Sequence, residues 1–181
     1  GGGNVAMDAC RTAKRLGAEK VYIIYRRSEA EMPARLEEIH HAKEEQIEFL
    51  NLHNPVRILV GENNEVTGME LQEMELGEPG ADGRRKPIPV DRFKTIDVDT
   101  VIISIGTSPN PLIKSTTEHL DTNKKGCISV DEDSMETTRE GVFAGGDAVT
   151  GAATVILAMG AGKKAAANMH KYICKKHGIE A

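Results

Sequence analysis

The sequence is poor in the residues that characterise several classes of protein. It has no Trp, only 3% aromatic residues and a formal net charge of −5. Proteins that bind nucleic acid or an anionic membrane surface through charge are usually basic. No apolar run reaches the roughly 18 residues of a membrane-spanning helix, and no secretion signal precedes the first motif. We therefore expect a cytoplasmic protein whose partners include neither nucleic acid nor a membrane.

Cysteine is scarce as well. Cys10, Cys127 and Cys174 are odd in number, far apart and without a Cys-x-x-Cys pair. Such spacing supplies neither a zinc or iron–sulfur site nor a redox dithiol. The adjacent His40 and His41 do not add a metal site, because neighbouring helical side chains diverge by about 100°. We expect three reduced, partly buried thiols and no metal ligands in this chain.

The strongest motif opens the chain. Gly1, Gly3 and Ala6 fit the G-x-G-x-x-G/A pattern of a dinucleotide-binding turn. The first glycine permits a sharp bend, the second lets the backbone approach a pyrophosphate, and the small third residue allows close packing. The phosphates then lie at a helix N-terminus, where amides and the helix dipole favour negative charge. This predicts cofactor binding by Gly1, Gly3, Asn4, Val5 and Ala6.

The residues after the turn supply the context that this motif requires. Small apolar residues recur at helical spacing from Asn4 to Leu16, and Gly17 is a plausible helix end. Residues 21–25 form a continuous β-branched and aromatic run, which is typical of a buried parallel strand. Turn, helix and strand follow in the order of a Rossmann unit. The strand that normally precedes the turn is not in the sequence.

The end of the second strand indicates which cofactor fits. An NAD site places Asp or Glu there, about 20 residues beyond the glycines, to bind the ribose 2′-hydroxyl. Here the strand runs into Tyr25, Arg26 and Arg27. Two guanidinium groups suit a 2′-phosphate, which Arg binds through paired hydrogen bonds and charge. The pattern favours NADP(H); the alternative is a pair of solvated arginines at a strand end.

The segment that follows is expected to complete the wound sheet and then change character. Residues 28–31 form a capping box, and Pro33 suits the first turn of the next helix. Residues 47–52 are a third strand. From residue 56 to residue 98 the apolar pattern has a period of two, which predicts an antiparallel meander. We expect this meander to replace a helical crossover and to carry no chemistry.

Four segments of the meander region can be placed. Residues 56–60 and 66–71 flank a Gly- and Asn-containing turn, as in a hairpin. Residues 77–85 are a polar, Gly-rich loop, and residues 93–96 belong to a further strand. Residues 99–106 then return to a buried-strand pattern, which ends at Gly106 and a Pro-containing turn.

A second group of candidate site residues lies near the C-terminal end. Residues 127–130 are predicted to form a short strand, and residues 141–144 an apolar strand that ends at Gly145, Gly146 and Asp147. A long helix then extends to about residue 176. Asp147 could accept hydrogen bonds from a ribitol hydroxyl, and the amides of Ala153 and Thr154 could face a flavin carbonyl. The alternative is that Asp147 only forms a turn.

With these two groups of candidate site residues in this order, the sequence resembles the pyridine nucleotide–disulfide oxidoreductase superfamily. Within it, the sequence most resembles the small (β) subunits of NADPH-dependent glutamate synthases and their homologues. The resemblance covers essentially the whole chain. The segments that carry it are Gly1 to Asp8, Tyr25 to Arg27 with Glu31 to Pro33, Gly106 with Pro109 and Asn110, and Gly141 to Asp147.

The resemblance implies an α/β fold with two parts. Residues 1–105 would be a Rossmann-like, three-layer NADP(H)-binding domain, with a parallel sheet and an antiparallel β-meander, that lacks its first strand. Residues 106–181 would be the C-terminal part of an FAD/NAD(P)-binding domain. The implied cofactor contacts come from Gly1, Gly3, Asn4, Val5, Ala6, Tyr25, Arg26, Arg27, Gly106, Gly146, Asp147, Ala153 and Thr154.

The implied function is that of an electron-input flavoprotein subunit. Hydride would pass from NADPH to FAD and electrons onward, through iron–sulfur clusters bound by an N-terminal part, to a large glutamate synthase subunit or another electron-accepting subunit. Glutamine and 2-oxoglutarate would become glutamate there. No side-chain acid or base is needed for hydride transfer, so no catalytic residue is predicted. We expect this chain by itself to be inactive and to purify without flavin.

Two alternatives remain at this point. One is a homologous NADPH-dependent subunit with another acceptor, as in transhydrogenases or sulfide dehydrogenases. The other is a non-catalytic NADP-sensing module, which would have no need of the second group of candidate site residues, around Asp147. A dehydrogenase with one Rossmann domain, such as a short-chain reductase, is less favoured. The sequence leaves the oligomeric state open, including a homo-oligomer.

Overall fold

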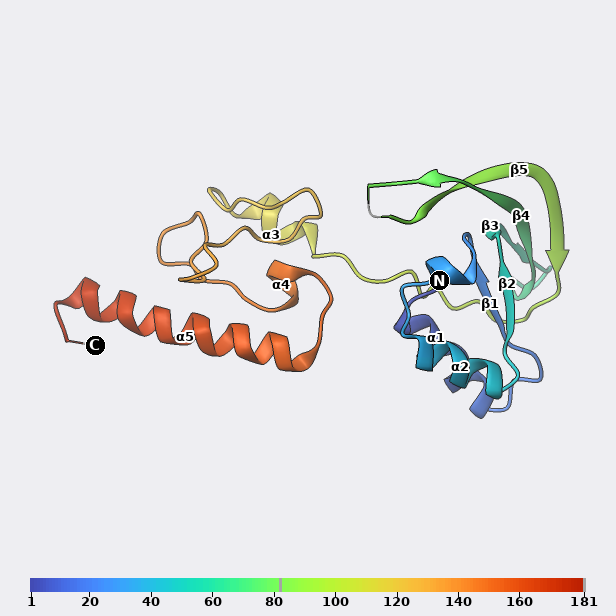
Figure 1. The fold of residues 1–181 in the computed structure, drawn as a ribbon, viewed down its shortest axis with the longest axis horizontal. Coiled ribbons are helices and arrows are strands. Elements are labelled where there is room, and N and C mark those ends of the chain that lie inside the picture. Colours follow the sequence, from blue (N-terminus) through green and yellow to red (C-terminus); the bar gives the residue numbers. More distant parts are fainter. Residues whose placement is uncertain (82, 181) are drawn as a thin grey trace. The chain divides into compact units, whose positions relative to one another are not determined.

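The chain folds into two compact units. The computed structural model describes residues 1–81 and 83–180. The first unit is Gly1–Gly106 and the second is Thr107–Ala181. Figure 1 shows the helices and strands of both units, and each unit is considered by itself below.

The first unit begins with the elements expected after the glycine turn. These are helix α1 (Asn4–Arg15), strand β1 (Tyr22–Tyr25), a 3-10 helix (Glu29–Glu31), helix α2 (Leu36–Glu44) and strand β2 (Glu48–Asn51). Strands β1 and β2 are parallel, with Ile23 opposite Phe49. This arrangement confirms the predicted order of turn, helix and two parallel strands.

Local sequence determines where these elements end. At Gly17 φ is +105°, a left-handed conformation that glycine adopts without strain. The amides of Gly17 and Ala18 donate to the carbonyls of Lys14 and Ala13, which closes α1 in a Schellman motif. The predicted capping box is also present, with Ser28 and Glu31 bonded to each other. The placement of Pro33 in a helical turn was wrong, because α2 begins only after its N-cap, Arg35.

The antiparallel part of the first unit consists of strands β3 (His53–Val60), β4 (Val66–Pro79) and β5 (Arg85–Ile96), in that order across the sheet. The hairpin predicted from residues 56–71 is therefore confirmed. The polar loop is shorter than residues 77–85, since β4 pairs with β5 up to the bridge between Pro79 and Arg85.

Three layers result. Figure 1 shows α1 and α2 on one side of β1 and β2, with the antiparallel sheet on the other. Both α1 and β3 contact β1. The fold of the first unit is thus α/β, with a parallel sheet and an antiparallel meander.

The core lies between α1, α2 and the parallel strands. Cys10 is part of it, and burial raises the pKa of its thiol to about 11. Cys127 and Cys174 are buried and free as well, as expected from their spacing. The buried residues of the core are Ala6, Met7, Cys10, Ile23, Tyr25, Met32, Ile39, Ala42 and Ile47.

The buried strand predicted at residues 99–106 was wrong. This segment has no strand conformation, and Ile103 and Ile105 are 69% and 81% exposed. A strand requires a neighbour for its backbone hydrogen bonds, and within the described residues β1 pairs with β2 alone. The apolar, β-branched pattern is present, but no strand in the described part of the chain pairs with the segment.

The second unit contains α3 (Pro111–Thr116), α4 (Asp147–Thr150) and α5 (Val155–His177). Helix α3 was not predicted, although Asn110 caps it through Leu112 and Pro111 occupies its first turn. Helix α5 confirms the long C-terminal helix. Among the described residues, no helix combines the length and the apolar character needed to span a bilayer.

The two strands predicted in the second unit, at residues 127–130 and 141–144, were wrong. Within residues 107–180, strand pairing is limited to the isolated bridges Thr122–Ile128, Val130–Thr137 and Glu136–Phe143. Left-handed residues at Gly126, Met135 and Gly141, with φ of +83°, +61° and +73°, turn the chain between these bridges. The paired stretches are therefore too short to become regular strands.

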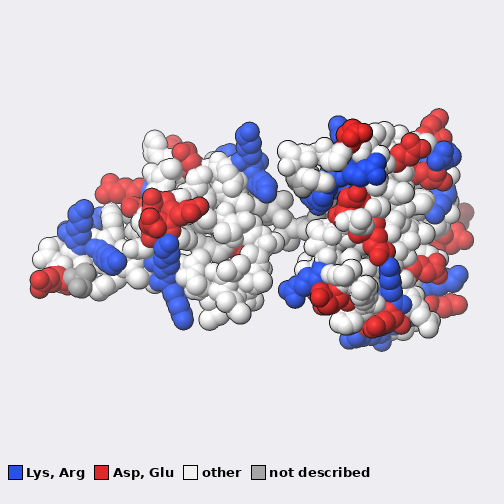
Figure 2. Space-filling view, viewed as in Figure 1, with Lys and Arg blue, Asp and Glu red and all other residues white. Residues whose placement is uncertain are grey.

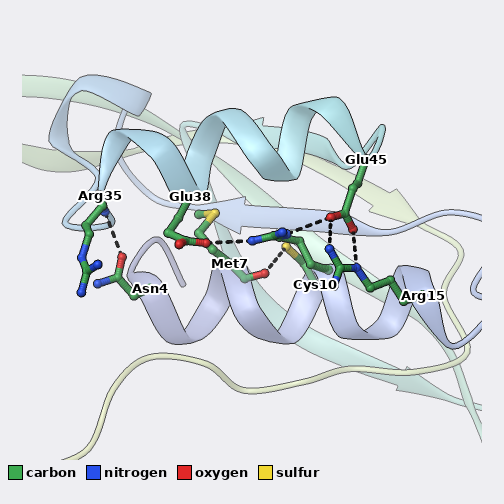
Figure 3. A network of polar contacts seen from close by, with 8 residues as sticks. Asn4, Met7, Cys10, Arg15, Arg35, Glu38 and Glu45 are labelled. Atoms are coloured by element: carbon green, nitrogen blue, oxygen red, sulfur yellow. Dashed lines mark hydrogen bonds and ion pairs between the residues drawn. The ribbon is translucent and has the colours of Figure 1, made fainter. Parts of the chain in front are cut away.

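Ion pairs join α1 to α2, as Figure 3 shows. Arg11 donates to Glu38 (Nη1–Oε2 2.8 Å) and to Glu45 (Nε–Oε1 3.0 Å). Arg15 donates to the same Glu45 carboxylate (Nη2–Oε1 2.6 Å). The hydrogen bond from Arg15 is the main cause that lowers the pKa of Glu45, and Arg11 adds to it.

The lowered pKa of Glu45 predicts a pH-dependent contribution to stability. A carboxyl group with a depressed pKa in the folded state stabilises that state above its unfolded pKa, about 4.3, and loses this effect as pH falls through the folded pKa. Glu45→Gln should therefore lower the urea midpoint at pH 7, and the difference from the wild type should shrink toward pH 3. The exposed neighbour Glu44 gives the control, since Glu44→Gln should change neither. Equal midpoints for Glu45→Gln and the wild type at pH 7 would contradict the prediction.

Candidate functional site

The first two glycines are required by the protein itself. The nitrogen of Gly1 donates to the carbonyl of Ile24 (3.1 Å), at the end of β1. A Cβ on Gly1 would lie 1.8 Å from the carbonyl oxygen of Ser104, which no side chain tolerates. A Cβ on Gly2 would lie 2.8 Å from the ring of Tyr25. Both glycines allow the chain to pass closely between neighbouring segments.

Gly3 is different, because the protein leaves space around it. The nearest atom to a Cβ placed there is Cγ of Pro33 at 3.8 Å, an ordinary contact distance. Gly3 is the N-cap of α1, with no side-chain cap, and no acidic residue lies in the first turn. Within residues 1–81 and 83–180, the amides of Asn4 and Val5 donate to no acceptor. An open approach and unpaired amides at the start of a 12-residue helix fit an anion such as a pyrophosphate.

The next three predicted residues have different environments. The side-chain oxygen of Asn4 accepts a hydrogen bond from the amide of Arg35 (2.9 Å), which links the start of α1 to the N-cap of α2 (Figure 3). Val5 is exposed, whereas Ala6 is buried in the core. Asn4 thus orients the turn with its side chain, and Ala6 supports the close packing that the motif predicts.

The end of β1 places the remaining predicted residues of the first unit. Tyr25 is buried below the turn, where its ring contacts Gly2 and its hydroxyl donates to the carbonyl of Glu31 (2.8 Å). Arg26 is exposed. Arg27 is half-buried, and its Nε donates to the carbonyl of Arg85 (2.8 Å). Since Arg26 directly follows Tyr25, the arginines begin next to the residue that packs against the glycine turn.

In the second unit, Asp147 organises the loop before α5. Gly146, with φ of +67°, is the N-cap of α4, and Asp147 is the first residue of that helix. The Oδ1 atom of Asp147 accepts the amide of Ala153 (3.2 Å). That amide is therefore occupied by Asp147, while the side chain of Thr154 caps α5 through Leu157 (3.4 Å). The second carboxylate oxygen of Asp147 and the amide of Thr154 remain the candidate flavin contacts.

The predicted site residues fall into two groups, each within one unit. Gly1 to Ala6 and Tyr25 to Arg27 lie around the start of α1 and the end of β1. Gly146 to Thr154 lie around the start of α5. Gly106 belongs to neither group; it is exposed, with φ of +94° and no atom within 4 Å of an added Cβ. Contact of any of these residues with a cofactor stays a prediction.

The sequence analysis missed two residues of the first group. Gly2 occupies a variable position of the motif, yet it is buried and its carbonyl accepts the amide of Ala34 (3.1 Å). The signal for Gly2 was its place within a run of three consecutive glycines. Arg85 was missed because its contact with Arg27 joins positions 58 residues apart, for which the sequence carries no signal.

Charge is mixed on the face that Figure 2 shows. Figure 2 shows Lys and Arg side chains interspersed with Asp and Glu on the visible face of both units. On this face, recognition of an anion would therefore depend on particular side chains and amides rather than on a broad basic surface.

Comparison with known proteins agrees with this geometry. The model of the pyridine nucleotide-disulphide oxidoreductase family matches residues 1–165. The chain belongs to this family.

Curated relatives align with nearly all of the chain. The chain is 42% identical to the NADP(+)-dependent formate dehydrogenase subunit beta of Moorella thermoacetica, covering 96% of this chain and 24% of that protein. It is 39% identical to the NADPH-Fe(3+) oxidoreductase subunit beta of Geobacter sulfurreducens, covering 96% and 29%. The NADPH-dependent glutamate synthase small chain of Escherichia coli is 36% identical, with 92% and 36% covered. The chain thus spans between a quarter and little more than a third of these relatives.

Solved structures show the same fold. Thioredoxin reductase from T. acidophilum superposes with a TM-score of 0.75 at 24% identity, over 94% of this chain and 50% of that one. FprA of Mycobacterium tuberculosis, solved in complex with NADPH, gives a TM-score of 0.74 at 15% identity, over 100% and 54%. The α/β fold expected from the sequence is confirmed.

Proposed function

We propose that this chain is the NADP(H)-binding part, together with a portion of the FAD-binding part, of an NADPH-oxidising flavoprotein that delivers electrons to a partner subunit. The observation that carries the proposal is the open, unpaired N-terminus of α1 at Gly3, with Arg26 and Arg27 at the end of the neighbouring strand β1. The first feature suits a pyrophosphate, and the second suits a 2′-phosphate.

The chain's own residues would bind and orient the nucleotide. The amides of Asn4 and Val5 would donate to the pyrophosphate, and the guanidinium groups of Arg26 and Arg27 to the 2′-phosphate. When both cofactors are bound, the chemistry that they supply is hydride transfer from NADPH to FAD. The protein contributes position and electrostatics to such a step, and no acid or base among the site residues is needed.

The second group of residues supports the flavin part of the proposal. The carboxylate of Asp147 is held by Ala153 at the entrance to α5, and the N-terminus of that 23-residue helix lies next to it. A carboxylate suits a polyol hydroxyl, and a helix N-terminus suits a carbonyl that gains negative charge on reduction. These groups fit the ribitol and the pyrimidine edge of a flavin.

The names of the relatives support an electron-transfer role with a variable acceptor. The names of the relatives described above all include NADP(+) or NADPH. They differ in the enzyme named: a formate dehydrogenase, an Fe(3+) oxidoreductase and a glutamate synthase. We therefore propose an electron-accepting partner subunit, reached through iron–sulfur centres outside this chain. The large subunit of a glutamate synthase, which would make glutamate from glutamine and 2-oxoglutarate, is one such partner.

Gly3→Ala separates binding from folding. The added Cβ has room in the free protein, so stability should change by no more than about 1 kcal/mol. It would occupy the space through which a pyrophosphate approaches the amides, so NADPH affinity should fall about tenfold or more in calorimetry. Gly160→Ala, in an equally open position of α5, should leave the affinity unchanged. Undiminished affinity in Gly3→Ala would place the phosphates elsewhere.

The arginine pair should determine cofactor preference. The protein should bind NADPH more tightly than NADH, and Arg26→Ala combined with Arg27→Ala should reduce NADPH affinity about tenfold or more while NADH affinity stays the same. Arg57→Ala is the matched control, because Arg57 is exposed on β3 and pairs with Glu70. Equal calorimetric affinities of the wild type for the two nucleotides would exclude recognition of the 2′-phosphate.

A further inference from the structure

Arg27 is anchored to the antiparallel sheet by its main chain and by its side chain. Its carbonyl accepts the amide of Leu52 (3.0 Å), and the carbonyl of Leu52 accepts the amide of Met74 on β4 (2.8 Å). Its Nε donates to the carbonyl of Arg85, the first residue of β5 (2.8 Å). The terminal amino groups of Arg27 take no part in the bond to Arg85, which leaves them for a ligand.

The side chain of Arg85 fixes the position of that carbonyl. Strand β5 contains Pro87 and Pro89, which have no N–H to donate to β4. The guanidinium of Arg85 donates instead to the carbonyls of Gly77 (Nε, 3.1 Å) and Leu76 (Nη2, 3.2 Å). It thereby supplies donors to β4 next to the prolines and holds the start of β5, from which the carbonyl of Arg85 reaches Arg27.

We propose that Arg85 is a positioning residue for cofactor selection: it holds the start of β5 so that its own carbonyl orients the Arg27 guanidinium toward the 2′-phosphate of NADPH. The proposal rests on the function proposed above and assigns a role to the meander. A guanidinium fixed at Nε presents its terminal amino groups in one direction, so less side-chain freedom is lost on binding. Arg26, which is exposed, contributes charge without this anchoring.

The test is a calorimetric comparison of NADPH and NADH binding. Arg85→Ala should weaken NADPH binding about fivefold and leave NADH binding unchanged. The expected loss corresponds to part of the free energy of one charge-assisted hydrogen bond. Arg85→Lys should behave like Arg85→Ala, because an ammonium lacks the rigid planar fork with which Nε and Nη2 of Arg85 reach the two carbonyls. Arg92→Ala is the control: Arg92 also joins β5 to β4, through Glu73 (2.6 Å), and should change neither affinity.

A double-mutant cycle distinguishes positioning from general support of the fold. In the Arg27→Ala background, Arg85→Ala should cause no further loss of NADPH affinity, because it acts through Arg27. The role of Arg85 would be overturned if the losses of NADPH affinity in the two single variants simply add in the double variant, or if Arg85→Lys behaves like the wild type. It would also be overturned if Arg85→Ala leaves NADPH affinity unchanged or weakens the binding of both nucleotides equally. If the wild type itself does not prefer NADPH, the proposed function fails first; if it does and Arg85→Ala keeps the full preference, this inference alone fails.

Discussion

The close passage of the glycine turn over β1 is the constraint on which the rest of the first unit depends. Gly2 lies against the ring of Tyr25 where no side chain fits, and Gly1 is bonded to Ile24. This contact sets the height of α1 above the sheet and leaves its first amides facing outward at Gly3. The core below the turn and the ion pairs to α2 then stabilise that placement. Because the turn is glycine, its backbone would itself form the proposed binding surface.

In the proposed site, binding and selectivity come from different parts of the same unit. The N-terminus of α1 offers amides and a helix dipole that suit any dinucleotide. Discrimination between NADPH and NADH would depend on charged side chains at the end of β1, and one of them, Arg27, is held by the antiparallel sheet. A meander that covers one face of the parallel strands thus also contacts the segment that would recognise the 2′-phosphate. The different names of the relatives fit this division, because the proposed nucleotide site would not depend on the electron acceptor.

Several features that depend on local chemistry could be predicted from the sequence, although helix α3 was missed and Pro33 was misplaced. Gly17, the capping box at Ser28 and the parallel strand at residues 21–25 each follow from residues within a few positions of one another. Features that depend on distant partners were mispredicted or missed. Residues 99–106 have the composition of a buried strand, but strand formation requires a paired neighbour. The contact between Arg27 and Arg85 depends on how two sheets meet, which periodicity does not encode.

The central claim is that the start of α1 and the end of β1 form one NADP(H) site. It is tested most directly by recording backbone amide chemical shifts of the protein during titration with NADP⁺. The account predicts that the largest changes occur at Gly3, Asn4 and Val5 together with Arg26 and Arg27, and that all of them saturate at the same nucleotide concentration. Changes confined to other segments, or separate saturation of the two groups, would contradict it.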